Sequence, residues 1–132
     1  TLWLLLIAGY YYYVFHVGDS RIYRVGEKVQ QLTSDEVTLI EENGRSKTLL
    51  ANYFGKSEDL QLNRIDGELQ KGMCFLLGTD GLFKKLPKEE LGIKIGWFKS
   101  DRQAQRKCEE LFQRVINLGE RDNVSCILVN VF

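Results

Sequence analysis

Three aspartates occupy short turns in the sequence and could together bind metal ions. Each lies beside a small or flexible residue, in the pairs Gly18-Asp19, Asp80-Gly81 and Asp122-Asn123. Such neighbours let the backbone bend sharply and let a ligand come close. Converging carboxylates repel one another unless protons or cations lie between them, and their oxygens suit Mg²⁺ or Mn²⁺. Two such ions about 3.5–4 Å apart are a common device for attack of water on phosphorus, so the pattern predicts metal-dependent phosphate hydrolysis.

Taken singly, each of these pairs is typical of a plain turn, because Asp-Gly and Asp-Asn are common turn dipeptides. Their contexts change this interpretation. The apolar run that ends at Val17 leads into the first turn, the run from Met73 to Leu77 leads into the second, and the run after Asn123 follows the third. A continuous apolar run of this length is consistent with a buried strand. The order and setting of the three turns therefore favour a site assembled at strand ends.

The remaining pattern predicts the elements that would position this site. Alternating or continuous apolar runs predict strands over residues 2–8, 10–17, 21–25, 28–32, 60–65, 73–77 and 124–132. Helix signals predict helices from residues 33–36 to about 43–44, over 87–91 and over 101–118, with Asp66-Gly67 as a turn. In the third helix one apolar face combines Ala104, Cys108, Leu111, Phe112 and Val115. Many antiparallel strands with few helices predict an α+β sandwich.

Composition excludes several classes of function. The 132 residues suffice for one domain with a core, and Lys+Arg equals Asp+Glu at 18 each. The absence of basic excess argues against a nucleic-acid-binding domain. Cys74, Cys108 and Cys126 lack metal-ligand spacing, so we expect reduced, mostly buried thiols and a cytoplasmic protein. A single histidine, His16, excludes a multi-histidine site.

The N-terminal apolar run has two possible interpretations. Residues 2–15 resemble a signal peptide or membrane helix in hydrophobicity, but Gly9 interrupts them and four consecutive tyrosines follow. The run is also shorter than the roughly 20 residues that a membrane span needs. We therefore predict two strands and no membrane association. Because Thr1 comes first and Met73 is the only methionine, we expect the chain to begin inside a larger polypeptide.

The motifs together resemble the metal-dependent (type 2C) protein serine/threonine phosphatases. The resemblance rests on three stretches in family order, which are His16 to Tyr23 followed by Gln31 to Asp35, then Phe75 to Phe83, then Arg121 to Ser125. The second stretch contains Thr79-Asp80-Gly81-Leu82, where the family has Ser-Asp-Gly-Leu. The matches extend over the whole chain.

This resemblance implies two antiparallel β-sheets flanked by helices, with Mn²⁺ or Mg²⁺ between them, two or three ions in the complete domain. Asp80 and Asp122 would be metal ligands, and Asp19 would help to hold a third, weaker metal. Gly81, Asn123 and Arg21 are possible supporting residues. A metal-bridged hydroxide would attack phosphoserine or phosphothreonine in a protein substrate, with a serine/threonine kinase or its targets as partners in signalling.

The sequence also departs from the family pattern. The Asp-Gly-x-Gly-Gly element that supplies the other metal ligand is absent, as is an N-terminal phosphate-binding arginine, and Asp35-Glu36 replaces the usual Asp-His. We therefore expect residues 1–132 to form one partial phosphatase domain without its N-terminal strands, and to be inactive alone. The alternative is a truncated or degenerate, non-catalytic binding or regulatory module.

Other candidate residues have simpler interpretations. Cys108 and Arg114 have the Cys-x5-Arg spacing of cysteine-dependent phosphatases, but the intervening residues lack glycine and lie in a predicted helix. His16 could be a catalytic acid, although a structural histidine is favoured. Arg21 could bind phosphate, although bracing of a carboxylate is favoured. Trp97 and Phe98 could form an exposed hydrophobic contact, although core packing is favoured. The cluster of Lys84, Lys85 and Lys88 could steer phosphoproteins or form a solvated face.

Overall fold

The computed structural model describes residues 1–56 and 59–132, and of residues 93 and 94 only the backbone. Its strands are β1 (Leu2–Ala8), β2 (Tyr11–Val17), β3 (Arg21–Val25), β4 (Val29–Gln31), β5 (Val37–Glu42), β6 (Arg45–Leu50), β7 (Asn63–Glu68), β8 (Cys74–Gly78) and β9 (Cys126–Asn130). Its helices are α1 (Asp80–Phe83), α2 (Lys88–Ile95) and α3 (Asp101–Asn117). The chain is therefore α+β, as the pattern predicts.

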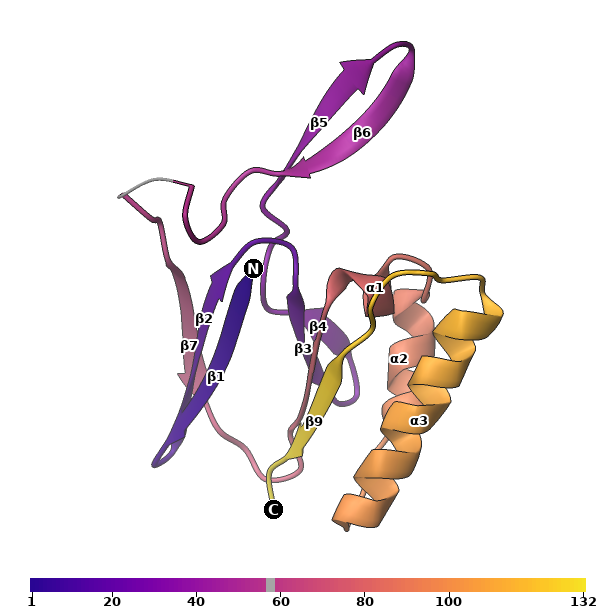
Figure 1. The fold of residues 1–132 in the computed structure, drawn as a ribbon. Coiled ribbons are helices and arrows are strands. Elements are labelled where there is room, and N and C mark those ends of the chain that lie inside the picture. Colours follow the sequence, from indigo (N-terminus) through magenta and orange to yellow (C-terminus); the bar gives the residue numbers. More distant parts are fainter. Residues whose placement is uncertain (57–58) are drawn as a thin grey trace.

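Two antiparallel sheets form successive layers, and helices form a third (Figure 1). The first sheet has the order β1-β2-β7 and the second the order β4-β3-β8-β9. Strands β1 and β2 form the predicted hairpin, with Leu2 opposite Val17 and Ala8 opposite Tyr11. Its turn contains Gly9 at φ +58°, a left-handed conformation that favours glycine.

A compact apolar cluster joins the two sheets. Tyr12 and Val14 of β2 pack against Ile22 of β3 and against Phe75 and Leu77 of β8, and all five side chains are buried. The rings of Tyr12 and Phe75 meet edge to face at 5.0 Å between centroids, a favoured aromatic geometry. Tyr12, Val14 and His16 are buried on one face of β2, because successive side chains of a strand point to opposite faces of the sheet.

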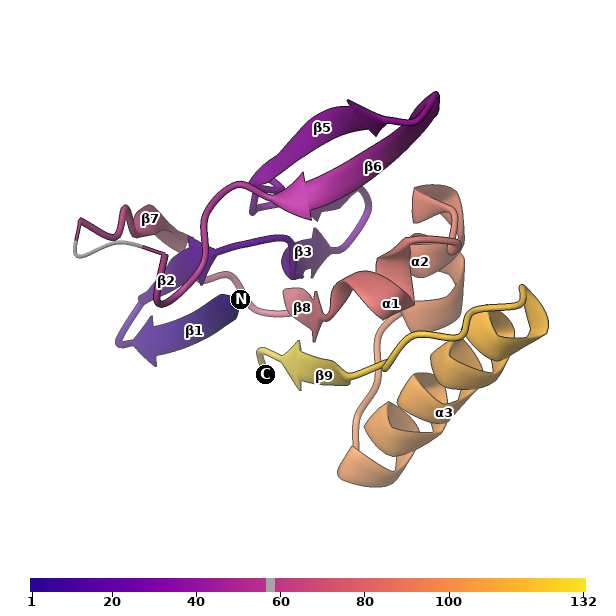
Figure 2. The same ribbon diagram turned by 45° about the horizontal axis from the view of Figure 1, so that its top comes forward.

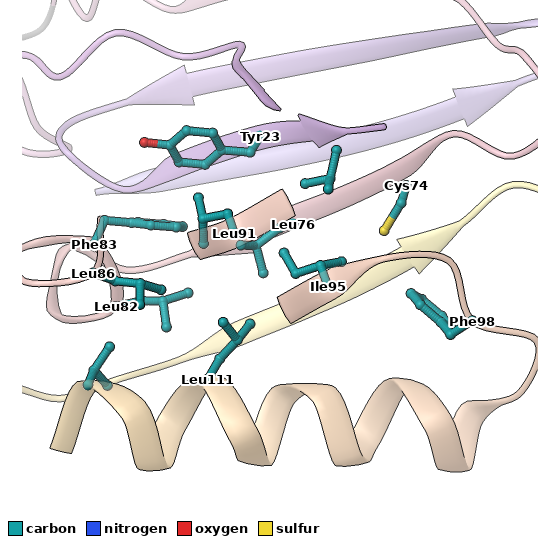
Figure 3. Packing of buried hydrophobic residues seen from close by; sticks show 12 residues of the cluster. Tyr23, Cys74, Leu76, Leu82, Phe83, Leu86, Leu91, Ile95, Phe98 and Leu111 are labelled. Carbon is teal, nitrogen blue, oxygen red and sulfur yellow. The ribbon is translucent and has the colours of Figure 1, made fainter. Parts of the chain in front are cut away.

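A second cluster joins the outer face of the second sheet to the helices (Figure 3). Leu111 and Val115 of α3 and Ile95 of α2 are fully buried against Leu76 of β8. The side chain of Ser100 caps α3 by accepting a hydrogen bond from the Gln103 N–H at 3.3 Å. The helices thus cover one sheet, and the outer face of β1 carries exposed leucines instead. The expected flanking by helices is confirmed on one side of this chain.

The connections that carry the three acidic turns meet at one end of the molecule. The β2–β3 turn, α1 and the loop from α3 to β9 lie at the same end of the layers in Figure 1. Antiparallel pairing of β3 and β9 with β8 brings about this convergence, because Arg21 and Cys126 both lie opposite Gly78. Sheet register therefore decides which turns become neighbours.

The predicted helix ending at residues 43–44 is wrong. Residues 37–42 and 45–50 form a β5–β6 hairpin that extends away from both sheets (Figures 1 and 2). Its turn is Asn43-Gly44, with φ of 53° and 74°. Two positive φ values suit a two-residue hairpin loop, for which Asn-Gly is the strongest short signal. The β-branched residues Val37, Thr38 and Ile40 also favour strand over helix.

Smaller expectations also need correction. Asp66 and Gly67 lie within β7 rather than in a turn, and a side chain at Gly67 would overlap the ring of Tyr12. Phe98 is buried as expected, whereas Trp97 is exposed. Phe112 is also exposed, because α3 turns its Leu111–Val115 stripe toward the sheet.

No helix among the described residues is long and apolar enough to cross a membrane. The N-terminal apolar run forms β1 and β2, as predicted.

Candidate functional site

Asp80 is positioned by a buried strand and a short anchored helix. All five residues of β8 are buried, and Asp80 begins α1 directly after Thr79. Asp80, which we expected in a turn, is therefore the first residue of a helix. Leu82 and Phe83 of α1 are buried in the second cluster, between the second sheet and the helices, and this burial holds α1 in place. The Asp80 Oδ1 accepts a hydrogen bond from the Gly81 N–H at 2.9 Å.

Asp122 lies in the loop between α3 and β9, where backbone hydrogen bonds order the chain. The Glu120 Oε1 accepts hydrogen bonds from the N–H groups of Arg121 and Asp122, at 2.8 and 3.0 Å. The Asp122 Oδ1 in turn accepts from the Asn123 N–H at 2.8 Å. These bonds fix the conformation of the loop and the orientation of the Asp122 carboxylate.

The two segments are joined closely enough to require glycine at position 81. Thr79 and Ser125 exchange hydrogen bonds of 3.1 Å, from the Thr79 N–H to the Ser125 carbonyl and from the Ser125 N–H to the Thr79 Oγ1. A side chain at Gly81 would overlap the carbonyl oxygen of Asn123. Gly81 and Asn123, both candidate supporting residues, thus make the contact that sets Asp80 beside Asp122.

A lysine lies between the two carboxylates. The Lys84 Nζ is 2.6 Å from the Asp80 Oδ2 and 2.8 Å from the Asp122 Oδ2. The hydrogen bond to Asp122, followed in size by the one to Asp80, raises the pKa of Lys84. The hydrogen bond from Lys84 in turn lowers the pKa of Asp122. The sequence pattern suggested only substrate steering or a solvated face for Lys84. The signal for this bridge was its i,i+4 spacing from Asp80, which puts both side chains on one helix face.

Asp19 lies in the β2–β3 turn, on the Asp80 side of the site. Gly18 beside it has φ +103°, which glycine adopts readily. Partial burial, followed by repulsion from Asp80, raises the pKa of Asp19, whereas Lys84 acts in the opposite direction. The charge of Asp80 therefore reaches Asp19, whereas Asp80 and Asp122 are joined through their shared partner, Lys84.

Arg21 braces the site rather than facing it. Its Nε and Nη2 donate to both oxygens of Asp35 at 2.6 to 3.1 Å, and its guanidinium lies 5.7 Å from the centre of the Phe83 ring. A bidentate pair of this kind orients both groups strongly. Because Phe83 belongs to α1, Arg21 links the loop containing Asp35 to the helix that begins at Asp80.

Glu36 is a positioning residue that sequence reasoning did not select. Its carboxylate accepts hydrogen bonds from the Gly18 N–H at 2.8 Å, from Asn63 at 2.8 Å and from Asn52 at 3.1 Å. Burial opposes ionisation, but these donors together outweigh it and lower the pKa of Glu36. The sequence feature that could have identified Glu36 is the pair Asp35-Glu36, where the family has Asp-His. His16 is buried, and its Nε2 finds no hydrogen-bond partner among the residues that the structure describes.

Cys108 and Arg114, which have the Cys-x5-Arg spacing, are part of the helix packing. Cys108 is half-buried on α3, while the Arg114 guanidinium binds Glu90 of α2 through two hydrogen bonds of 2.7 and 2.9 Å. Burial, with Cys108 nearby, raises the pKa of the Cys126 thiol to about 12. A thiol with so high a pKa is a poor nucleophile at neutral pH.

The donor chemistry of the site suits a divalent cation in part. Asp80 and Asp122 present hard oxygen atoms to one position, and that position attracts a positive charge in this structure, the Lys84 ammonium. Among residues 1–56 and 59–132, no three His, Cys, Asp or Glu side chains are grouped closely enough to hold a metal ion. Asp80 and Asp122 could therefore supply two ligands to such an ion.

No family model and no curated protein matches the sequence. Among solved structures, the Streptococcus agalactiae serine/threonine phosphatase is similar with a TM-score of 0.83 and 24% identity, over 97% of this chain and 57% of that one. PppA of Pseudomonas aeruginosa, described as a key regulatory component of its T6SS, has a TM-score of 0.81 and 23% identity, over 98% and 56%. The Mycobacterium tuberculosis serine/threonine phosphatase PstP/Ppp has a TM-score of 0.73 and 19% identity, over 96% and 57%.

These similarities confirm the type 2C resemblance at the level of fold. The chain spans little more than half the length of the solved structures that it matches. Over nearly all of its own 132 residues, it has the fold of the type 2C bacterial serine/threonine phosphatases.

Proposed function

We propose that this chain contributes part of a metal-dependent site that hydrolyses phosphoserine and phosphothreonine in proteins. One observation carries the proposal. Asp80 and Asp122 come from segments far apart in the sequence, yet their Oδ2 atoms converge on a single positive charge. Burial, followed by repulsion from Asp80, raises the pKa of Asp19, so Asp19 lies close to Asp80. Two converging carboxylates repel each other unless a cation lies between them. The convergence of Asp80 and Asp122 therefore supports a site that binds positive charge.

Each residue has a distinct part in this proposal. Asp80 and Asp122 would hold a divalent ion, Mn²⁺ or Mg²⁺, and Asp19 would support an accessory ion. When bound, the ion would lower the pKa of water and neutralise charge on the phosphate. Gly81 and Asn123 keep the two ligand segments in contact, and Arg21 holds the neighbouring loop.

The substrate class follows from the fold similarity and is likewise a proposal. The S. agalactiae and M. tuberculosis proteins are serine/threonine phosphatases, so we expect phosphorylated proteins, such as a serine/threonine kinase or its targets, as substrates. About two-fifths of each matched structure has no counterpart in these 132 residues. We expect further metal ligands to come from that part of the domain, and little activity from residues 1–132 alone.

The test is Asp80→Asn in the complete protein. Asparagine keeps the size of the side chain and can still accept from the Gly81 N–H, but it removes the charge. We expect loss of Mn²⁺-dependent phosphopeptide hydrolysis, measured as phosphate release after removal of metal with a chelator and its re-addition. Asp66→Asn is the matched control, because Asp66 is an exposed carboxylate on β7. Near-normal turnover by Asp80→Asn would refute the assignment and favour the non-catalytic alternative.

A further inference from the structure

Every carboxylate oxygen of the Asp80–Asp122 pair already has a partner. The Oδ1 atoms of Asp80 and Asp122 accept backbone hydrogen bonds from Gly81 and Asn123. The Oδ2 atoms are both in contact with the Lys84 ammonium. An incoming cation therefore meets a pair of carboxylates whose outward-facing oxygens are occupied.

The position of Lys84 is built into the fold. Lys84 follows the last residue of α1, and its N–H donates to the Asp80 carbonyl, so its backbone is tied to the helix that carries Asp80. Its side chain spans from α1 to the Asp122 loop. Lysine rather than arginine suits this place, because a compact ammonium can contact two oxygens from one point.

The ammonium is also free to leave. The Lys84 side chain is 49% exposed, and the Asp122 side chain is 46% exposed. Exposed ion pairs of this kind contribute little individually, and a lysine stem can turn into solvent. Mg²⁺, for example, needs oxygens at about 2.0–2.1 Å, and the charge of a divalent ion would repel an ammonium in contact with the same two oxygens. The two cations therefore exclude each other.

We infer that the Lys84 ammonium is a built-in occupant of the Asp80–Asp122 cation position, and that a divalent ion binds these carboxylates only by displacing it. The inference rests on the proposed function, because it takes Asp80 and Asp122 as metal ligands. It adds a residue that sets metal affinity. In metal-free protein the same ammonium neutralises the two converging carboxylates.

The first test is Mn²⁺ binding to the complete protein by isothermal titration calorimetry. Lys84→Met keeps the length of the side chain and removes its charge. We expect about tenfold tighter binding by this variant, because the metal no longer has to break two ion pairs. Lys85→Met is the matched control, since the Lys85 Nζ donates to the Gly119 carbonyl and does not contact either aspartate. Circular dichroism checks that each variant is folded.

Asp80→Asn separates failure of this inference from failure of the proposed function. Weaker Mn²⁺ binding by Asp80→Asn, without tighter binding by Lys84→Met, would overturn the inference and leave the proposed function standing. Unchanged Mn²⁺ binding by Asp80→Asn would remove Asp80 as a ligand, and both proposals would fail.

A second measurement does not depend on a variant. Acetic anhydride acetylates free lysine amines, and mass spectrometry reads the extent at each residue. We expect saturating Mn²⁺ to increase acetylation of Lys84 in the wild-type protein and to leave Lys85 unchanged. Equal acetylation of Lys84 with and without Mn²⁺ would overturn the inference.

Discussion

At the scale of single residues, close approach of backbone segments decides the geometry of the site. Gly81 is the clearest case, because the space that a side chain would fill there belongs to the Asn123 carbonyl. Asp80 and Asp122 lie on the two sides of this Gly81–Asn123 contact. They can share the Lys84 ammonium only while the contact is kept.

We expect Gly81→Ala to separate these segments. Moving backbone to admit a methyl group typically destabilises a protein by about 1–3 kcal/mol, and here it would also weaken Mn²⁺ binding. Urea unfolding and calorimetric Mn²⁺ titration of the complete protein measure the two effects. Gly26→Ala is the control, because a side chain there meets open space and Gly26 has no positive φ. Equal stability and Mn²⁺ affinity in Gly81→Ala and the wild type would contradict this role.

At the scale of elements, one carboxylate connects segments that secondary structure leaves separate. Glu36 receives hydrogen bonds from the β2–β3 turn through Gly18, from β7 through Asn63 and from the loop after β6 through Asn52. The Glu36 N–H also donates to the Gly18 carbonyl at 2.9 Å. The turn that carries Asp19 is thus held by its neighbours rather than by its own strands alone.

This arrangement predicts a pH-dependent contribution to stability. The folded-state pKa of Glu36 lies below its ordinary value of 4.5, so its contribution is present above pH 4.5 and is lost as the pH falls through the lowered pKa. Glu36→Gln places an amide donor among three donors. At pH 7 we expect it to lower the free energy of unfolding by about 1 kcal/mol.

Urea unfolding of Glu36→Gln and wild-type protein between pH 7 and pH 3.5 checks this prediction. The difference in free energy between them should shrink at low pH, where the wild-type carboxylate also loses its charge. Glu41→Gln on exposed β5 is the control and should match the wild type throughout. A Glu36→Gln difference that stays constant over the pH range would argue against a charge-dependent role.

At the scale of the whole molecule, the three layers are unequally covered. Helices α2 and α3 cover the second sheet, whereas Leu2, Leu4 and Leu6 face outward from the edge strand β1. An apolar groove also lies between β1 and β9, lined by Trp3, Leu4, Leu5, Ile7, Leu77, Ile127 and Val129. Exposed apolar surface beside an edge strand favours self-association.

We therefore expect the 132-residue chain, prepared alone, to bind a hydrophobic dye and to aggregate. Leu4 and Leu6 are 48% and 47% exposed, so replacing both with lysine should reduce dye fluorescence and the aggregated fraction in light scattering. Leu39→Lys on the projecting hairpin is the control, since it removes an exposed leucine away from this face. A wild-type preparation that is monodisperse and melts cooperatively would contradict the prediction.

The sequence by itself determined the parts of the fold that depend on local pattern. Helix α3 followed from its 3.6-residue apolar period, and β8 from a continuous apolar run. The β5–β6 hairpin did not, because acidic residues after Thr33 and Ser34 also suit a helix start. In the folded chain, cross-strand pairing around Asn43-Gly44 outweighs that local signal.

The order of the three aspartate motifs was likewise visible in the sequence, and with it the resemblance to a phosphatase fold. Tertiary structure alone decided that Asp80 and Asp122 share Lys84, that Gly81 must lack a side chain, and that Glu36 holds the Asp19 turn. These contacts join segments far apart in the chain, and their geometry depends on sheet register. Local periodicity carries no information about such distances, so only the folded chain reveals them.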